Sequence, residues 1–160
     1  MSEFDRIDLR ILTLLSNNAR ISNKEIAADV NLAPSSVHQR VKRLYESGVL
    51  QGSYSDIDLD KIGLPIKALL FIQLAEHRKS DLEEFLNRLL DIAEVKGGWM
   101  VTGKFDAIVE IVARDTNHVH RVVIEKFSSR EEIQRIETSI IFERVIQRDM
   151  TKTLNLVENT

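Results

Sequence analysis

The spacing of apolar residues changes once along this chain of 160 residues, and the change limits the folds that it can adopt. Before residue 48, apolar residues recur every three or four positions, which is the period of an amphipathic helix. After residue 64, short alternating runs typical of strands are separated by further helical stripes. We therefore expect an α+β protein with an all-helical N-terminal domain and a mixed C-terminal domain.

Two helices are predicted ahead of residue 30. The first covers about residues 5–16, where apolar residues at helical spacing share one face. Ser22 and Glu25 then have the spacing of a capping box, in which each side chain accepts the backbone N–H of the other residue. This box predicts a second, short helix over residues 23–29.

A third helix is predicted from Pro34, because proline lacks an N–H that would have no intrahelical partner in the first turn. Gly48 is the expected glycine after its last turn. About three residues separate this helix from the second one. Two helices joined by so short a turn form a helix-turn-helix, whose second helix enters the major groove of DNA.

The charge of the third helix differs from that of the chain as a whole. The formal net charge of −3 argues at first against a protein that coats nucleic acid. Residues 1–50, however, carry seven Lys and Arg against six Asp and Glu, and residues 30–45 contain no acidic residue. Such a local basic stripe is typical of a small nucleic-acid-reading element, although a solvated helix face is the plainer alternative.

The polar side chains of the third helix suit contacts with duplex DNA. Arginine can bind guanine, glutamine can bind adenine, and serine and lysine suit phosphates. Together with two residues that open the second helix, the predicted DNA-binding set is Asn23, Lys24, Ser35, Ser36, His38, Gln39, Arg40, Lys42 and Arg43. Replacing Arg40 or Arg43 by alanine is predicted to weaken DNA binding and to leave the fold intact.

The second domain reads as two similar halves. Its strands are predicted over residues 66–75, 95–102, 107–113 and 133–145. A helix capped by Ser80 and Glu83 should follow the first strand, with the apolar stripe Leu82, Phe85, Leu86, Leu89 and Leu90. A helix capped by Thr116 should precede the last strand. The order β-α-β-β-α-β is the ferredoxin-like arrangement, whose bare sheet face is expected to be buried in a dimer.

The boundary between the domains is predicted in residues 57–64, where Gly63 and Pro65 mark a turn. The predicted domains are residues 1–56, which hold the helix-turn-helix, and residues 65–160, with residues 57–64 as the linker.

In the second domain, the loop from Gly103 to Asp106 is a possible binding site for an amino acid. Backbone amides beside a glycine can hold a carboxylate, and Asp106 could hold an ammonium group. A simple hairpin turn is the alternative, and chemistry alone favours it.

The chain shows no motif of an enzyme. It contains no cysteine, so thiolate zinc sites and cysteine nucleophiles are excluded. No metalloprotease, P-loop, nucleophile-elbow or dinucleotide-binding motif is present, and no catalytic residue, cofactor or metal is predicted. Its apolar runs are too short to span a bilayer, and its start lacks a signal peptide. We therefore expect a cytoplasmic protein without a membrane partner.

Five segments together resemble the Lrp/AsnC family of leucine-responsive, or feast/famine, transcriptional regulators. These segments are residues 7–12, 18–22, 37–44, 46–50 and 101–106. The resemblance covers about residues 3–150. Two residues depart from the family pattern: Phe105 stands where the family usually has tyrosine, and Ala33 where it often has serine.

The resemblance implies a DNA-binding domain followed by an effector-binding and oligomerisation domain. Dimers would form through the sheet and assemble into tetramers or octamers, with an amino acid or a related molecule between dimers. By position, the implied effector residues are Met100, Thr102, Gly103, Lys104 and Asp106, with Thr138, Ser139 and Ile140 from a neighbouring subunit.

The main hypothesis is a sequence-specific transcriptional regulator whose assembly or DNA affinity responds to an amino acid. One alternative is a tetrapyrrole decarboxylase, because some enzymes resemble such regulators in both domains. The basic third helix speaks against it, since such an enzyme has no need of that helix. Another alternative is an architectural protein that wraps DNA with little sequence preference.

Overall fold

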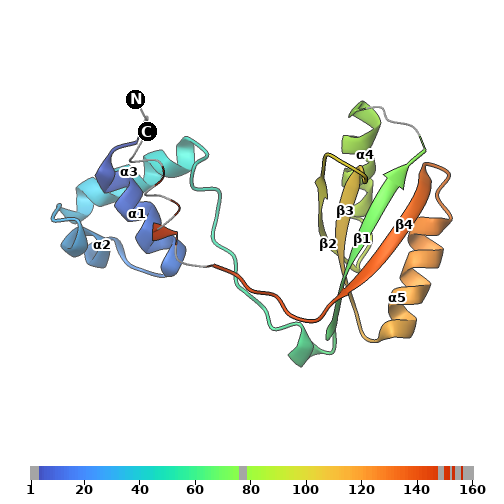
Figure 1. The fold of residues 1–160 in the computed structure, drawn as a ribbon. Helices are drawn as coiled ribbons and strands as arrows, with labels where there is room; N and C mark the ends of the chain where they lie inside the picture. The colour runs from blue at the N-terminus through green and yellow to red at the C-terminus, as the bar shows by residue number, and fades with distance from the viewer. Residues whose placement is uncertain (1–3, 76–78, 148–149, 152, 154–155, 157–160) are drawn as a thin grey trace. The chain divides into compact units, whose positions relative to one another are not determined.

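The computed structural model describes residues 4–75, 79–147, 150–151, 153 and 156. These residues fall into two compact units, one from the described parts of residues 1–56 and 145–160 and the other from residues 57–144 (Figure 1). This division differs from the predicted domains in two ways. Residues 57–64 belong to the second unit, and Val145 and the described residues after it belong to the first.

The described part of the first unit contains α1 (Arg6–Asn17), α2 (Asn23–Asp29) and α3 (Pro34–Glu46). The predicted capping box of Ser22 and Glu25 is present at the start of α2. Each helix contributes to one small core, whose fully buried side chains are Ile11, Ile26, Val37 and Leu44. Asn31 adopts the left-handed conformation, with φ 53°, and so lets the chain turn between α2 and α3.

The two ends of α3 differ in how they are closed. Ala33 precedes the helix and provides no side-chain cap, and Pro34 occupies the first turn as predicted. At the other end, Ser47 ends the helix and its hydroxyl donates to the carbonyl of Leu44 at 3.0 Å. Gly48 follows with φ 76°, a left-handed conformation that glycine adopts at little cost.

The second unit contains a four-stranded antiparallel sheet in its described residues. Its elements are β1 (Ile66–Leu74), α4 (Lys79–Leu89), β2 (Val95–Met100), β3 (Ala107–Ala113), α5 (Thr116–Val122), the π-helical continuation Val123–Ser128 and β4 (Ile133–Ile141). The strand order is β2-β3-β1-β4, so β1 pairs with β3 on one side and with β4 on the other. The predicted order of elements, β-α-β-β-α-β, is confirmed.

Several predicted ends in this unit were wrong. The second and fourth strands end at Met100 and Ile141, because each loses its pairing partner there. The side chain of Asp115, not that of Thr116, caps α5 by accepting the backbone N–H of His118 at 2.7 Å. Leu90 lies beyond the end of α4 and is 60% exposed. The side chains of Ser80 and Leu82, by contrast, lie outside the described residues.

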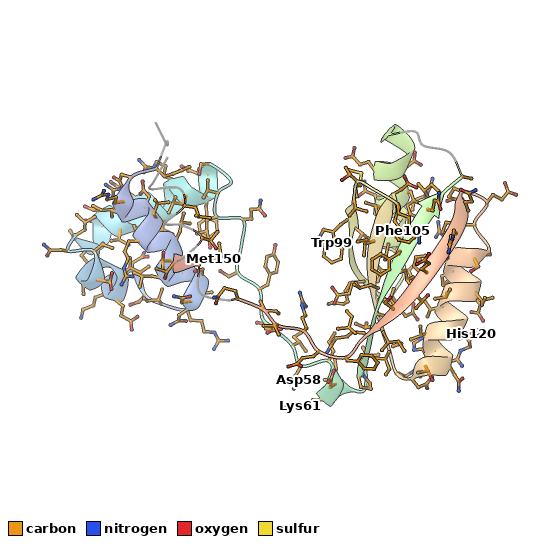
Figure 2. All side chains as sticks on the ribbon, viewed as in Figure 1. Asp58, Lys61, Trp99, Phe105, His120 and Met150 are labelled. Atoms are coloured by element: carbon orange, nitrogen blue, oxygen red, sulfur yellow. The ribbon has the colours of Figure 1, made fainter. Side chains whose placement is uncertain are left out.

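One face of the sheet packs against α4 and α5 and forms the core of this unit (Figure 1). Alternate residues of β1, such as Leu70 and Ile72, point into that core. We call the other side of the sheet the open face. It presents Leu69, Phe71 and Ile108 from the central strands. Trp99, labelled in Figure 2, lies on the edge strand β2 opposite Ile108 and is 50% exposed.

Candidate functional site

The polar residues of α3 fall into two groups that point in different directions. Ser35, His38, Gln39 and Lys42 have the spacing i, i+3, i+4, i+7, which places them along one side of the helix. All four are exposed. We call this side the recognition face.

The start of α2 extends the recognition face. The Nδ2 atom of Asn23 lies 3.4 Å from Nδ1 of His38, and Lys24 beside it is exposed. Lys42 is paired only loosely, with its Nζ 3.6 Å from a carboxylate oxygen of Glu46 and both side chains exposed. Because an exposed pair of this kind contributes little energy, the ammonium group of Lys42 can readily exchange its partner.

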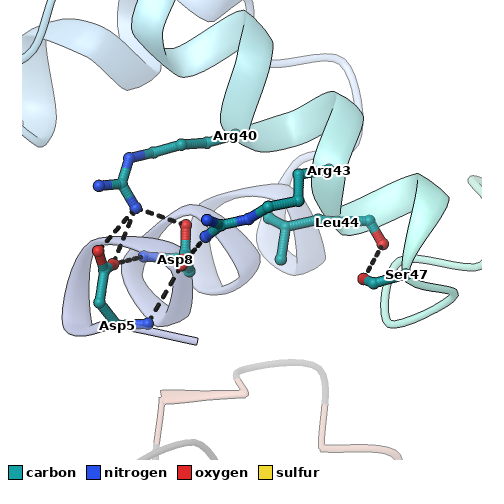
Figure 3. Close-up of polar contacts among 6 residues, drawn as sticks. All are labelled: Asp5, Asp8, Arg40, Arg43, Leu44 and Ser47. Carbon is teal, nitrogen blue, oxygen red and sulfur yellow. Dashed lines mark hydrogen bonds and ion pairs between the residues drawn. The ribbon is translucent and has the colours of Figure 1, made fainter. Parts of the chain in front are cut away.

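Arg40 and Arg43 lie on the other side of α3 and contact α1 (Figure 3). The Nη1 atom of Arg40 donates to Oδ1 of Asp8 at 2.7 Å and to both carboxylate oxygens of Asp5, at 2.8 and 3.0 Å. The Nη2 atom of Arg43 donates to Oδ2 of Asp8 at 2.5 Å. The sequence predicts both arginines as contacts to bases or phosphates and does not indicate their carboxylate partners.

The two aspartates also form the N-terminal cap of α1. Oδ1 of Asp5 accepts the backbone N–H of Asp8 at 2.9 Å, and Oδ2 of Asp8 accepts the N–H of Asp5 at 3.1 Å. The guanidinium group of Arg40 has a raised pKa because it donates to Asp8 and to Asp5. Partial burial raises the pKa of Asp5, but its bonds to the N–H of Asp8 and to Arg40 outweigh that effect and lower it. We call these four residues the Asp8 cluster.

A capping-box signal could have identified half of this cluster. Asp5 and Asp8 are three residues apart and precede a helical stripe, which is the spacing of a box with an acidic residue in the first turn. Nothing in the local sequence indicates that Arg40 and Arg43, more than thirty residues later, complete their ion pairs.

The predicted effector loop connects β2 to β3, and its backbone is tied to the end of β1. Asp106 donates its N–H to the carbonyl of Ile72 at 2.9 Å, and its Oδ2 accepts the N–H of Leu74 at 2.9 Å. The register of β1 with β4 shifts between Gln73 and Leu74, so Asp106 binds a backbone group at an irregular point of the sheet. Its carboxylate therefore has a structural partner within the chain.

Lys104 and Phe105 connect the same loop to the open face. The Nζ atom of Lys104 donates to Oε1 of Glu137 on β4 at 2.7 Å and lies 4.7 Å from the centre of the Phe105 ring. The rings of Phe105 and Phe71 are 5.4 Å apart. The bond from Lys104 lowers the pKa of the Glu137 carboxyl group, although partial burial opposes this effect.

The other predicted effector residues occupy two places in the sheet unit. Met100 lies at the end of β2, Thr102 and Gly103 follow in the loop, and all three are exposed. Gly103 has φ 114°, a conformation that residues with a side chain rarely adopt. Thr138, Ser139 and Ile140 are exposed along β4, where they pair with β1.

The first unit holds a groove that the sequence did not predict, with a volume of about 390 Å³. Leu12 and Leu15 of α1 line it, together with Tyr45 and Val49 near the end of α3. Met150, from the C-terminal part of the chain, also lines it. The groove therefore joins the helix-turn-helix to a segment that follows β4.

The two histidines of α5 differ in their surroundings. Nδ1 of His118 accepts the N–H of Arg114 at 3.2 Å, and its Nε2 lies 3.1 Å from Oε1 of Glu94. His118 therefore joins α5 to the loop before β2, whereas His120 is exposed.

Among the described residues, no group of three or more His, Asp and Glu side chains is placed to hold a metal ion. No helix in the described part of the chain is long and apolar enough to cross a membrane.

A helix-turn-helix with an exposed polar recognition face, joined to a separate sheet unit, is typical of DNA-binding regulators. Residues 4–51 match the family model of a winged helix-turn-helix DNA-binding domain. Residues 67–151 match the model of the Lrp/AsnC ligand binding domain. The chain belongs to the Lrp/AsnC family of transcriptional regulators.

Similar proteins agree with this assignment. The transcriptional regulator AldR of Mycobacterium tuberculosis is 34% identical over 144 residues, covering 90% of this chain and 80% of AldR. The structure of E. coli AsnC is 26% identical, with a TM-score of 0.81 over 91% of this chain and 97% of AsnC. The regulator NMB0573 of Neisseria meningitidis, solved with L-Met, has the same fold at 23% identity, with a TM-score of 0.82 over 90% and 93% of the two chains.

The family assignment decides between two of the hypotheses. The relatives are regulators with a DNA-binding helix-turn-helix, so this chain is a transcriptional regulator and not a tetrapyrrole decarboxylase.

Proposed function

We propose that this protein reads a specific DNA sequence through the recognition face of α3. The observation that supports this most strongly is the alignment of Ser35, His38, Gln39 and Lys42 along one exposed side of the second helix of the motif. In a helix-turn-helix, residues in the N-terminal part of that helix lie nearest the base edges. Asn23 and Lys24 extend the same surface and are placed to contact the DNA backbone.

The loop from Met100 to Asp106 is proposed as the effector site, and the effector as an amino acid. The complex of the Neisseria regulator with L-Met supports this class of ligand. Gly103 lets the backbone amides of an exposed loop approach a carboxylate. Asp106 also holds this loop in place, because its Oδ2 accepts the N–H of Leu74.

A second copy of the chain is proposed to cover the open face of the sheet. Leu69, Phe71, Ile108 and Trp99 present apolar surface there, and surfaces of this kind are commonly buried between subunits. Dimers would then assemble into tetramers or octamers, with Thr138, Ser139 and Ile140 of a neighbouring subunit close to the effector. An effector shifts such an assembly only by binding one state more tightly than another.

The DNA-binding proposal is tested by selecting duplexes from a random pool with the wild-type protein. We expect enrichment of repeated half-sites spaced by about one helical turn. Binding that does not discriminate between the selected and shuffled duplexes would instead favour the architectural protein considered above.

Gln39→Ala tests the recognition face itself. Loss of a base contact should weaken binding to the selected duplex by roughly fivefold or more. Gln134→Ala is the matched control, because it removes the same amide from an exposed position on β4 and should leave affinity unchanged. Equal affinity of Gln39→Ala and wild type, measured by fluorescence anisotropy, would remove Gln39 from the interface.

The cytoplasm is the proposed location, since a regulator of this kind acts where the chromosome lies. The relatives named above come from bacteria, in which the chromosome is cytoplasmic.

The effector proposal is tested by a thermal-shift screen of the amino acids, because a ligand that binds the folded state raises its stability. We expect one or a few amino acids to raise the melting temperature, and no shift with any of them would contradict an amino acid effector.

A further inference from the structure

The Asp8 cluster lies at the junction of α1 with the recognition helix and contains a carboxylate that water does not reach. The side chain of Asp8 is 0% exposed, whereas Arg40 is 25% and Arg43 is 54% exposed. An ionised carboxylate in such a position is costly unless charged partners compensate it. Asp8 therefore requires the arginines of α3 to stay in place when the domain is folded.

The two arginines differ in how many hydrogen bonds they donate to the aspartates and in how exposed they are. Arg40 uses Nη1 for three carboxylate oxygens and is mostly covered, so it neutralises Asp5 and Asp8 within the protein. In the part of the chain that the structure describes, Arg43 has a partner only at Nη2. The Nε and Nη1 donors of Arg43 can therefore bind another group, because the side chain is half-exposed. Its bond to Asp8 fixes the direction in which these donors point.

The position of Arg43 suits a contact with the DNA backbone. It is one residue after Lys42, at the border between the recognition face and the side of α3 that faces α1. A guanidinium group held at one end by a carboxylate loses less side-chain freedom when it binds a phosphate at the other.

We propose that Asp8 is a positioning residue for DNA binding. Its buried carboxylate holds Arg40 as a structural counter-ion and orients Arg43 so that the remaining donors of Arg43 bind a backbone phosphate. The two arginines thus have separate roles, although both belong to the same basic helix. This inference rests on the proposed DNA-binding function.

The experiment compares Asp8→Asn with Asp5→Asn in the full-length chain. Both variants remove one negative charge from the same turn, and asparagine in place of the N-cap residue Asp5 is also a good N-cap. Asp5→Asn leaves Asp8 to hold both arginines, whereas Asp8→Asn removes the carboxylate that Arg43 binds. Affinity is measured for the duplex that wild type selects and for a shuffled duplex, at a temperature at which circular dichroism shows all proteins folded.

We expect Asp8→Asn to bind the selected and the shuffled duplex roughly tenfold more weakly, because a contact with a phosphate does not depend on the base sequence. The slope of log affinity against log salt should fall by up to about one, because Arg43 no longer neutralises a phosphate in a fixed position. Asp5→Asn should bind both duplexes as wild type does. A role in stability alone would leave the affinities of the folded proteins unchanged, and equal binding by Asp8→Asn overturns the proposal.

A second pair of variants keeps the proposal testable if Asp8→Asn does not fold. Arg43→Gln should lower the slope of log affinity against log salt by about one, as for one lost phosphate contact. Arg40→Gln should leave that slope unchanged, because the guanidinium group of Arg40 is paired with Asp5 and Asp8 and not with a phosphate. Equal loss of slope in both variants overturns the division of roles. Failure of wild type to prefer any duplex would instead contradict the proposed function.

Discussion

Asp8 accepts hydrogen bonds from the guanidinium groups of Arg40 and Arg43, and both arginines belong to a different helix. The pair with Arg40 lies 32 positions apart in the chain, so it ties α3 to the first turn of α1. At the scale of single residues, the same side chains thus affect both the stability of the first unit and the orientation of its recognition helix. Stability and DNA affinity must therefore be measured separately for any variant in this cluster.

Arg40→Ala should destabilise the protein, contrary to the expectation from sequence that the fold would stay intact. The substitution leaves the buried Asp8 with one charged partner, which should cost about 2 kcal/mol of unfolding free energy. Lys42→Ala is the control from the same helix, and loss of its exposed pair with Glu46 should change stability by less than about 0.5 kcal/mol. Urea unfolding measures both, and equal stability of the two variants would contradict the structural role of Arg40.

The type of a residue and its place on a helix indicate what it can bind, but not which partner it has. Arg40 lies on α3 as predicted, whereas Val37 and Leu44 of the same helix are fully buried. The competing partner, Asp8, was not recognised because it lies in another helix and the tertiary packing alone brings it near. Asp106 repeats this pattern, since its partner Leu74 is 32 positions away.

Among the elements, helices were predicted more accurately than strand ends. A capping box and a glycine in the left-handed conformation mark helix ends within the local sequence, as at Ser22 and Gly48. The end of a strand depends instead on where its neighbour ends. Apolar residues after Ile141 extended the predicted β4, but β1 offers them no further pairing, and Phe142 is 98% exposed.

The loop between β2 and β3 is the element on which the effector proposal depends. Asp106→Ala should abolish the thermal shift caused by the effector and lower stability by about 1–2 kcal/mol, because the N–H of Leu74 loses its acceptor. Asp106→Asn keeps an acceptor oxygen and should retain most of the stability. Asp91→Ala, at an exposed position of the same unit, is the control. A normal thermal shift of Asp106→Ala would place the effector site elsewhere.

At the scale of the whole molecule, the proposed burial of the open face between two copies of the chain would determine how many DNA-binding units act together. An assembly that presents several recognition helices gains affinity for repeated half-sites, because binding of one helix raises the effective concentration of the next. In the proposed assembly, this gain would compensate for the net charge of −3, with one weakly basic helix per subunit on the DNA.

Trp99→Glu should shift the protein to smaller assemblies, since it places a charge on the open face. Its affinity for a duplex with repeated half-sites should fall by roughly a hundredfold, through loss of avidity. Leu90→Glu is the control, because Leu90 is an exposed apolar residue beyond the end of α4 on the covered side. Analytical ultracentrifugation gives the assembly size, and an unchanged size for Trp99→Glu would place the subunit interface on another surface.

The chain passes between its two units twice, after Asp56 and again after Arg144. In topological terms, the sheet unit is an insertion within the DNA-binding unit, and Met150 lines a groove beside Leu12 and Tyr45 on the far side of that insertion. A cut after Asp56 would release residues 1–56 as a separate chain. Such a fragment would lack the Met150 wall of the groove, so the groove is complete only when both parts of the DNA-binding unit are present.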